Sequence, residues 1–143
     1  MPQTARVLGR LWFEVVWNRG RRAAIAEFFS PNVQVHDAGQ SSIGIDAFLL
    51  FFDRMQDTFS DIHVEVEDIL AEYDKACVRW TFTAQHTGYG FSIPPTGAHV
   101  RATGLSVIHV EDGKVVEAWQ NWDMLGLMEQ IKGHITQATY VKA

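Results

Sequence analysis

The stretch His99–Asp123, HVRATGLSVIHVEDGKVVEAWQNWD, decides the fold that we expect for this chain. It predicts two β-strands joined by a tight turn, because Asp112-Gly113 stands between two runs rich in β-branched residues. Side chains alternate between the two faces of a strand, so the length of the turn decides which side chains meet. The stretch therefore predicts a β-hairpin whose register depends on the turn.

Two registers of this hairpin are open. A two-residue loop pairs Val110 with Val115 and places His109 and Asp123 on opposite faces. A three-residue loop with Gly113 in a left-handed bulge pairs His109 with Val115 and places His109 and Asp123 on the same face. We favour the bulged register, because glycine fits the left-handed position that follows a type I turn.

The bulged register gathers polar chemistry on one face of the hairpin. That face would carry His109, Arg101, Trp119, Asn121 and Asp123. Such a set suits a pocket that binds a polar, flat ligand. An ordinary hairpin with a solvated polar face explains the same spacing equally well.

Composition predicts one domain over residues 1–143, long enough to bury a core. The net charge of −5 gives no electrostatic reason to expect nucleic acid or an anionic membrane as a partner. The single cysteine, Cys77, excludes an internal disulfide and fits a reducing compartment. No signal peptide or run of membrane-spanning length is recognisable, so we expect a cytoplasmic protein.

The N-terminal part of the chain predicts helices from apolar residues at helical spacing. The expected helices are Thr4–Asn18, Arg21–Phe29 and Ile45–Phe59, with a short strand at Asn32–Asp37 between the second and the third. Phe13 and Trp17 lie beside the apolar stripe of the first helix, where they face either the core or the edge of a cavity.

The rest of the chain predicts long strands followed by a short helix. Alternation marks strands at Ile62–Glu67 and Lys75–Thr87, and Gly and Pro mark Gly88–Gly97 as a loop that folds over a cavity mouth. Met124–Ile131 closes the chain as a helix. Helices followed by consecutive antiparallel strands predict an α+β domain, with helices on one face of a sheet that curves into a cone around a pocket.

One face of the strand at Lys75–Thr87 predicts an interface. The side chains on this face are polar or β-branched, and they are those of Arg79, Thr81, Thr83 and Gln85. The side chains on the opposite face are apolar. We expect this face to form a homodimer.

Five short motifs carry a resemblance to a known family. They are His86-Thr87-Gly88, Ile93-Pro94-Pro95-Thr96-Gly97, Asp112-Gly113-Lys114, Glu117-x-Trp119 and Asp123-x-x-Gly126-Leu127. In this order, over at least Phe59 to Ile131, the chain resembles the SnoaL-like polyketide cyclase family of the nuclear-transport-factor-2-like (NTF2-like) superfamily.

The resemblance implies an NTF2-like cone, a curved antiparallel sheet closed by three N-terminal helices plus a short C-terminal helix, usually as a homodimer. It implies an intramolecular aldol ring closure without metal or organic cofactor. It also implies that Asp123 is the acid/base and that His109, fourteen residues earlier, lies in the same pocket. Tryptophans 119 and 122 would strengthen Asp123 as a base by burying it, and Arg101 would oppose them.

Each candidate also has a structural explanation. Asp123 is a favoured residue for capping the helix that starts at Met124. His36 faces either a pocket or solvent, and His86 orders the loop after it more readily than it binds substrate. No histidine spacing typical of a zinc site occurs, so we expect no metal.

We therefore expect an acid/base enzyme that acts on a small, flat, apolar or aromatic ketone. The binding residues would be His36, Trp119, Asn121, Arg101, Phe13, Trp17 and His86. Two alternatives stay open. One is an epoxide hydrolase, dehydratase or isomerase on the same scaffold, and the other is a non-catalytic, ligand-binding dimer.

Overall fold

The structure is a computed structural model that describes residues 4–37 and 39–140. Its helical elements are α1 (Ala5–Leu11), η1 (Trp12–Asn18), η2 (Arg22–Ala24), α2 (Ile25–Phe28), α3 (Ile45–Thr58) and α4 (Met124–Tyr140). Its strands are β1 (Phe29–Asp37), β2 (Gln40–Ile43), β3 (Phe59–Glu72), β4 (Lys75–His86), β5 (His99–Glu111) and β6 (Lys114–Trp122). The predicted α+β class is confirmed, and β2 is a strand that the sequence analysis did not predict.

The first predicted helix is one helical run made of two parts. The Thr4 hydroxyl accepts a hydrogen bond from the Val7 backbone N–H and so caps α1. From Trp12 the helix widens into the π-helix η1. Gly20, with a φ of 64°, follows it in the left-handed conformation that glycine adopts without strain.

The six strands form one curved sheet in the order β2-β1-β6-β5-β4-β3. Neighbouring strands are antiparallel except β1 and β6, which run parallel. Alternation along β4 and β5 is regular, with even-numbered residues facing the interior and odd-numbered residues facing outward. The concave face of the sheet therefore holds the apolar core.

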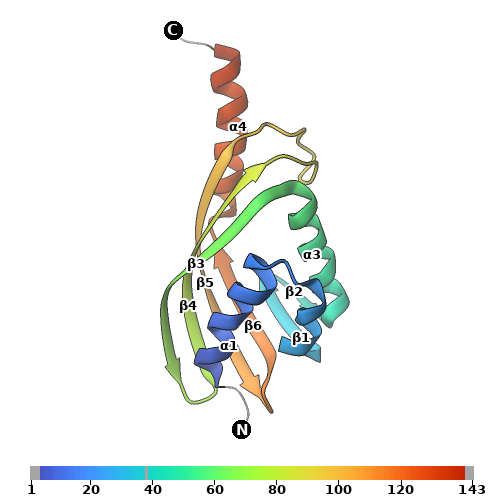
Figure 1. The fold of residues 1–143 in the computed structure, drawn as a ribbon, viewed down its shortest axis with the longest axis vertical. Coiled ribbons are helices and arrows are strands. Elements are labelled where there is room, and N and C mark those ends of the chain that lie inside the picture. Colours follow the sequence, from blue (N-terminus) through green and yellow to red (C-terminus); the bar gives the residue numbers. More distant parts are fainter. Residues whose placement is uncertain (1–3, 38, 141–143) are drawn as a thin grey trace.

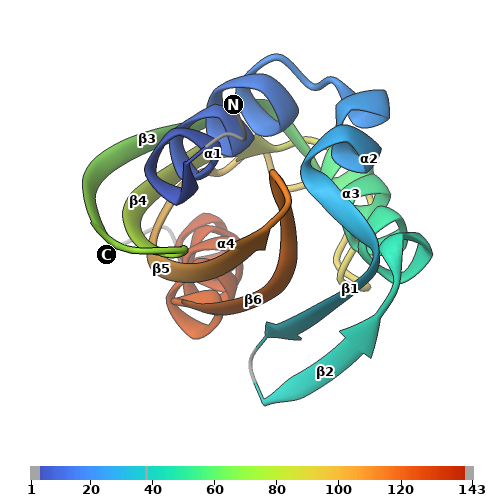
Figure 2. The same cartoon turned by 90° about the horizontal axis from the view of Figure 1, so that it is seen from below.

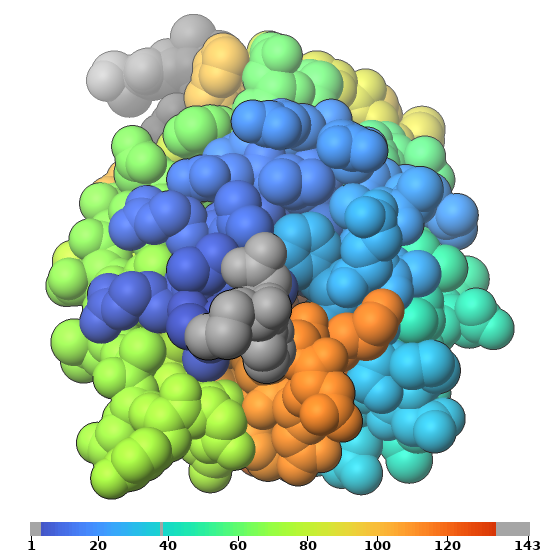
Figure 3. Space-filling model, turned by 60° about the horizontal axis from the view of Figure 1, so that its bottom comes forward, coloured from blue at the N-terminus to red at the C-terminus, as the bar shows by residue number. Residues whose placement is uncertain are grey.

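The helices close the concave side of this sheet. In Figure 2 the strands form an arc whose open side is covered by α1, α2 and α3. At the lower end, blue atoms of the N-terminal helices lie between green atoms of β3–β4 and cyan atoms of β1 (Figure 3). In Figure 1, α4 extends from the opposite end of the domain, and it runs beyond the predicted Ile131 to Tyr140.

The register predicted for the β5–β6 hairpin is wrong. Val110 pairs with Val115 across a two-residue loop, and both loop residues have positive φ, 52° for Asp112 and 77° for Gly113. Such a turn matches the twist of the strands. An irregularity at the next step skips Val116 and pairs His109 with Glu117. The extra residue therefore lies in β6 and not in the turn.

The loop 88–97 packs on the end of α3, away from any cavity mouth. The backbone N–H groups of Thr87 and Gly88 donate to the Thr58 carbonyl. A Cβ on Gly88 would collide with the Asp57 carbonyl, so only glycine allows this approach. None of the described loop residues lines the spaces between the sheet and the helices or the depression beside Asp123. In the part of the chain that the structure describes, no helix is long and apolar enough to cross a membrane.

Candidate active site

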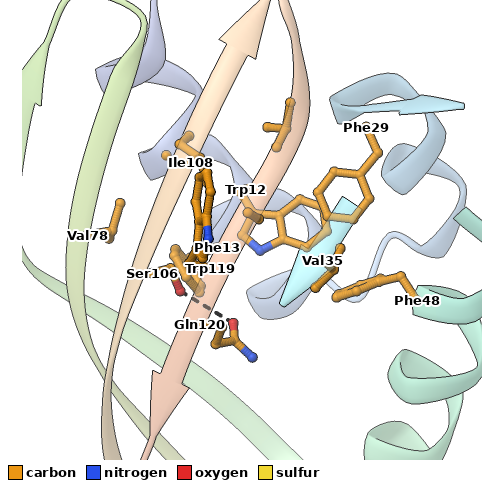
Figure 4. A pocket seen from close by; sticks show the side chains of 13 residues that line it. Trp12, Phe13, Phe29, Val35, Phe48, Val78, Ser106, Ile108, Trp119 and Gln120 are labelled. Carbon is orange, nitrogen blue, oxygen red and sulfur yellow. Dashed lines mark hydrogen bonds between the residues drawn. The ribbon is translucent and has the colours of Figure 1, made fainter. Parts of the chain in front are cut away.

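Two narrow chambers lie between the concave face of the sheet and the helices. The inner chamber, about 30 Å³, lies among Trp12, Phe13, Val35, Phe48 and Gln120. Trp12 stacks on Phe29 at its wall, and the Ser106 hydroxyl points to Gln120 across its floor (Figure 4). The second chamber, also about 30 Å³, shares Phe13 and Gln120 with the inner chamber. Each has room for a water or two and no more.

A larger space opens beside these chambers, between β1, β2, α3 and the start of α4. This mouth hollow has a volume of about 350 Å³. It shares Val35 and Phe48 with the inner chamber, and Phe51 and Trp122 with the second chamber. A volume of this size accepts a small organic ligand. The three spaces are therefore neighbouring parts of one interior.

Asp37 places a carboxylate in the wall of the mouth hollow. It ends the inward-facing row of β1 that begins with Val33 and Val35, and it lines the mouth hollow. Burial raises the pKa of Asp37, and hydrogen bonding from Gln120, then a weaker interaction with Trp122, acts in the opposite sense. Its Oδ1 is buried and has no hydrogen-bond partner among the described residues. The two carboxylate oxygens of Asp37 therefore have different surroundings.

A chain of hydrogen bonds holds the other oxygen of Asp37. Gln120 Nε2 donates to Asp37 Oδ2 at 3.1 Å, and Gln120 Oε1 accepts from the Ser106 hydroxyl at 3.3 Å. The Ser106 oxygen accepts in turn from the indole N–H of Trp80 at 3.0 Å. Each donor in this series of hydrogen bonds has one acceptor. The Gln120 amide is therefore oriented with its N–H toward Asp37.

His36 holds the β1–β2 hairpin against β6, away from the cavities. Its Nε2 lies 2.7 Å from a Glu117 carboxylate oxygen, and its Nδ1 lies 2.7 Å from the Ser41 hydroxyl. Its ring stacks on Trp119, with the centroids 5.5 Å apart. Since His36 precedes Asp37, these contacts also fix the strand that carries the carboxylate.

His109 and Asp123 are not brought together. His109 lies near the turns at the far end of β5, where its Nε2 is 2.9 Å from an Asp74 oxygen. It pairs with Glu117, six residues before Asp123 on β6. Six residues of strand span about 20 Å. The shared pocket that we expected for these two residues is therefore absent.

Asp123 has the capping role named as its structural alternative. Its Oδ1 accepts a hydrogen bond from the Gly126 backbone N–H at 2.9 Å at the start of α4. Its side chain is exposed in a shallow depression of the outer face, which Asn121 and Thr103 also line. Arg101 is exposed on the same face, and no ion pair between it and Asp123 exists among the described residues.

The predicted aromatic residues do reach the interior. Phe13 lines both chambers, Trp17 lines the second, and Trp119 borders the inner chamber. His86 lines none of the cavities. It is 1% exposed, and its Nδ1 accepts from the Thr96 backbone N–H at 3.3 Å. His86 therefore orders the loop, as the sequence analysis favoured, and burial lowers its pKa.

The sequence analysis missed Asp37, Gln120 and Ser106. Their signal was present, because the alternation that turns Val33 and Val35 inward turns Asp37 inward as well. Ser106 likewise stands in the apolar, even-numbered row of β5. Among the described residues, no group of three His, Cys, Asp or Glu side chains could hold a metal ion.

The sequence profile described as SnoaL-like polyketide cyclase matches residues 8–131. No curated protein sequence matches the chain. Among solved structures, AclR from Streptomyces galilaeus, a proposed hydroxylase, is 27% identical, with a TM-score of 0.81 over 90% of this chain and 96% of AclR.

Two further structures share the fold at lower identity. IdmH from Streptomyces antibioticus, a proposed polyketide cyclase, is 22% identical, with a TM-score of 0.81 over 91% of this chain and 99% of IdmH. A proposed polyketide cyclase from Acidithiobacillus ferrooxidans is 20% identical, with a TM-score of 0.80 over 92% of this chain and 96% of its own. The fold is therefore NTF2-like, and the chain belongs to the SnoaL-like polyketide cyclase family.

Proposed function

We propose that this chain is an acid/base enzyme of the polyketide cyclase type, which closes a ring by intramolecular aldol condensation on a flat, largely apolar ketone. The observation that carries the proposal is the half-buried carboxylate of Asp37, which lines an aromatic hollow of about 350 Å³. A carboxylate with a raised pKa is a stronger base near neutral pH than an exposed one. Asp37 therefore takes the role that the sequence analysis gave to Asp123.

The reaction needs one base that later acts as an acid. The Asp37 carboxylate removes a proton from a carbon between two carbonyl groups, and the electron pair of the C–H bond becomes the enolate. The enolate carbon attacks a second carbonyl carbon of the same substrate, forming the new C–C bond. The resulting alkoxide takes the proton back from Asp37, so the carboxylate is regenerated. No atom is lost, and the enolate charge is spread over the substrate itself.

The hydrogen-bond chain behind Asp37 supports this role. Gln120 fixes the orientation of the Asp37 carboxylate through its hydrogen bond to Oδ2. Fixing a base in one orientation lowers the cost of reaching the transition state. Aromatic walls from Phe48, Phe51 and Trp122 suit a flat substrate.

The test compares two aspartates in matched variants. We expect Asp37→Asn to lower kcat about 10²- to 10⁴-fold on an aromatic polyketide ketone, because asparagine keeps the shape but cannot accept the proton. Asp123→Asn, which can still cap α4, should turn over nearly as fast as the wild type. The opposite result would return the acid/base role to Asp123, and full activity in both variants would remove the mechanism.

A second candidate reaction comes from the likeness to AclR, a proposed hydroxylase. Hydroxylation would share the first step, removal of a carbon-bound proton by Asp37, but would need dioxygen and a reductant as co-substrates. Oxygen uptake during turnover separates the two reactions. An epoxide hydrolase has less support, because Arg101 and Asp123 lie on the outer face and form no ion pair that the structure describes.

A further inference from the structure

The hydrogen-bond chain that ends at Asp37 has a direction, and Trp80 sets it. The Trp80 indole N–H donates to the Ser106 hydroxyl oxygen at 3.0 Å, and the chain continues through Gln120 to Asp37 Oδ2. An indole N–H can only donate, and an ionised carboxylate can only accept. The two ends therefore determine the middle: Ser106 donates to Gln120 Oε1, and Gln120 turns its N–H toward Asp37.

The orientation of the Gln120 amide matters because an amide has two orientations of nearly the same shape. An amide turned by 180° would place its carbonyl oxygen, in place of its N–H, against Asp37. A carbonyl oxygen in that position favours the protonated carboxyl group, since only the acid can donate a hydrogen bond to it. The orientation of Gln120 therefore decides which protonation state of Asp37 the protein stabilises.

The first two residues of the chain are held by the core. Trp80 and Ser106 are 5% and 7% exposed, on the inward-facing rows of β4 and β5. The Trp80 ring packs on Phe13 and Trp122, with the ring centroids 5.7 and 6.3 Å away. A Cβ on Gly104 would overlap the same ring, so the backbone of β5 also confines it. Packing therefore keeps the indole N–H directed at Ser106.

Few charged groups compete with this chain at Asp37. Of the described residues that line the two chambers and the mouth hollow, from β1, β2, β6, α3 and α4 among other elements, Asp37 is the one with an ionisable side chain. His36, which precedes it, pairs with Glu117 on the other face of the sheet. The hydrogen bond from Gln120 is therefore a main influence that opposes burial of the carboxylate.

From these observations we infer that Trp80 and Ser106 are positioning residues: together they fix the direction of the hydrogen-bond chain, so that Gln120 presents its N–H to Asp37 and holds this residue in its ionised form. The inference rests on the proposed function in making the ionised Asp37 the base. It assigns roles to two residues that act through Gln120 and need no contact with a substrate.

The test compares Ser106→Val with Ser106→Thr in the full chain. Valine and threonine have nearly the same shape, but only threonine keeps the hydroxyl. The pKa of Asp37 is read from its carboxyl ¹³C signal during a pH titration, and the signal is assigned by its loss in Asp37→Asn. We expect Ser106→Val to raise the pKa of Asp37, with a fall of about 3- to 10-fold in its ionisation constant, and Ser106→Thr to restore the wild-type value.

Trp80→Phe tests whether the indole acts through Ser106. Phenylalanine keeps a ring and loses the N–H, so we expect a smaller rise in the pKa of Asp37. In a chain that already carries Ser106→Val, Trp80→Phe should add nothing, because the hydrogen-bond chain is already interrupted. If Ser106→Val does not fold, Ser106→Ala against the wild type gives the same comparison.

Three results would overturn the inference. They are an unchanged pKa of Asp37 in the variants without the hydroxyl, an equal rise in Ser106→Thr and Ser106→Val, and an effect of Trp80→Phe that is the same in both backgrounds. The titration needs no turnover. Full activity of Asp37→Asn would therefore remove the proposed function and leave the direction of the chain standing, whereas an unchanged pKa would do the reverse.

Discussion

Asp37 and Gln120 stand directly opposite each other on the parallel strands β1 and β6, and the Gln120 amide donates to Asp37 Oδ2 at 3.1 Å. The pairing joins the edge hairpin to the centre of the sheet at the point where the cavity opens. It also distinguishes the two carboxylate oxygens, because Oδ2 accepts this hydrogen bond and Oδ1 is buried without a partner among the described residues. The predictions below concern this pair, the residues around it and the outer face.

The pH dependence of turnover should report the burial of Asp37. A base acts when it is ionised, so kcat should rise with pH, with an apparent pKa above the ordinary value of 3.8. In Gln120→Glu a second carboxylate would face Asp37, and like charges favour the protonated form, so the rising limb should move to higher pH. A pH–rate profile measures both effects. An unshifted limb in Gln120→Glu would mean that another group is the base.

Asp123 should contribute to stability through its hydrogen bond to Gly126. Replacing an N-cap aspartate with alanine costs about 1 kcal/mol in the free energy of unfolding, whereas asparagine keeps the bond. We therefore expect Asp123→Ala to lower the urea midpoint and Asp123→Asn to leave it nearly unchanged. Equal loss in both variants would show that charge, and not capping, is what Asp123 provides.

Gly104 should be required for the packing behind Ser106. A Cβ at this position would overlap the Trp80 ring and the Trp122 side chain. Overpacking of this kind costs about 1–3 kcal/mol, so Gly104→Ala should lower the free energy of unfolding by that amount. Gly133→Ala is the control, because a Cβ there meets nothing within 4 Å and alanine favours the helix. Thermal unfolding of the two variants should shift in opposite directions.

His86 should make the fold sensitive to mild acid. Burial lowers its pKa below the ordinary 6.5, so the folded state holds it neutral while the unfolded chain takes up a proton. Stability is therefore fully present above pH 6.5 and falls as the pH drops through the lowered value. His86→Asn, compared with the exposed His63→Asn, should flatten the dependence of the urea midpoint on pH between 7 and about 5. An unchanged slope would assign the acid sensitivity to other groups.

The outer face of β4 stays our candidate for a homodimer interface. Thr83 is exposed in the middle of this face, between Arg79 and Gln85. Thr83→Arg would place like charges against each other across a two-fold axis and should convert a dimer to a monomer in sedimentation at micromolar concentration. Leu50→Lys, on the exposed side of α3, should leave the dimer intact. A wild type that sediments as a monomer would end this prediction.

The sequence by itself determined most of the elements, although not β2. Periodicity and turn chemistry are local properties, so the helix Ile45–Thr58, the strand β4 and the Asp112-Gly113 turn could be predicted within a residue or so. The resemblance to the SnoaL-like family was readable from the order of short motifs, and the match over residues 8–131 confirms it. The cap that Thr4 provides is a local property as well, because it acts within one helical turn.

Only the tertiary structure decided which face of each strand is enclosed. A single extra residue in β6 sets the pairing of the hairpin, and no local signal at Val116 marks it. The parallel pairing of β1 with β6 joins residues more than 80 positions apart, which places Asp37 beside Gln120 and leaves Asp123 outside. Burial of a carboxylate depends on what the rest of the chain packs around it. For this reason the sequence analysis chose Asp123, which lies on the outer face of the sheet. In the folded chain, the carboxylate that lies in the interior is that of Asp37.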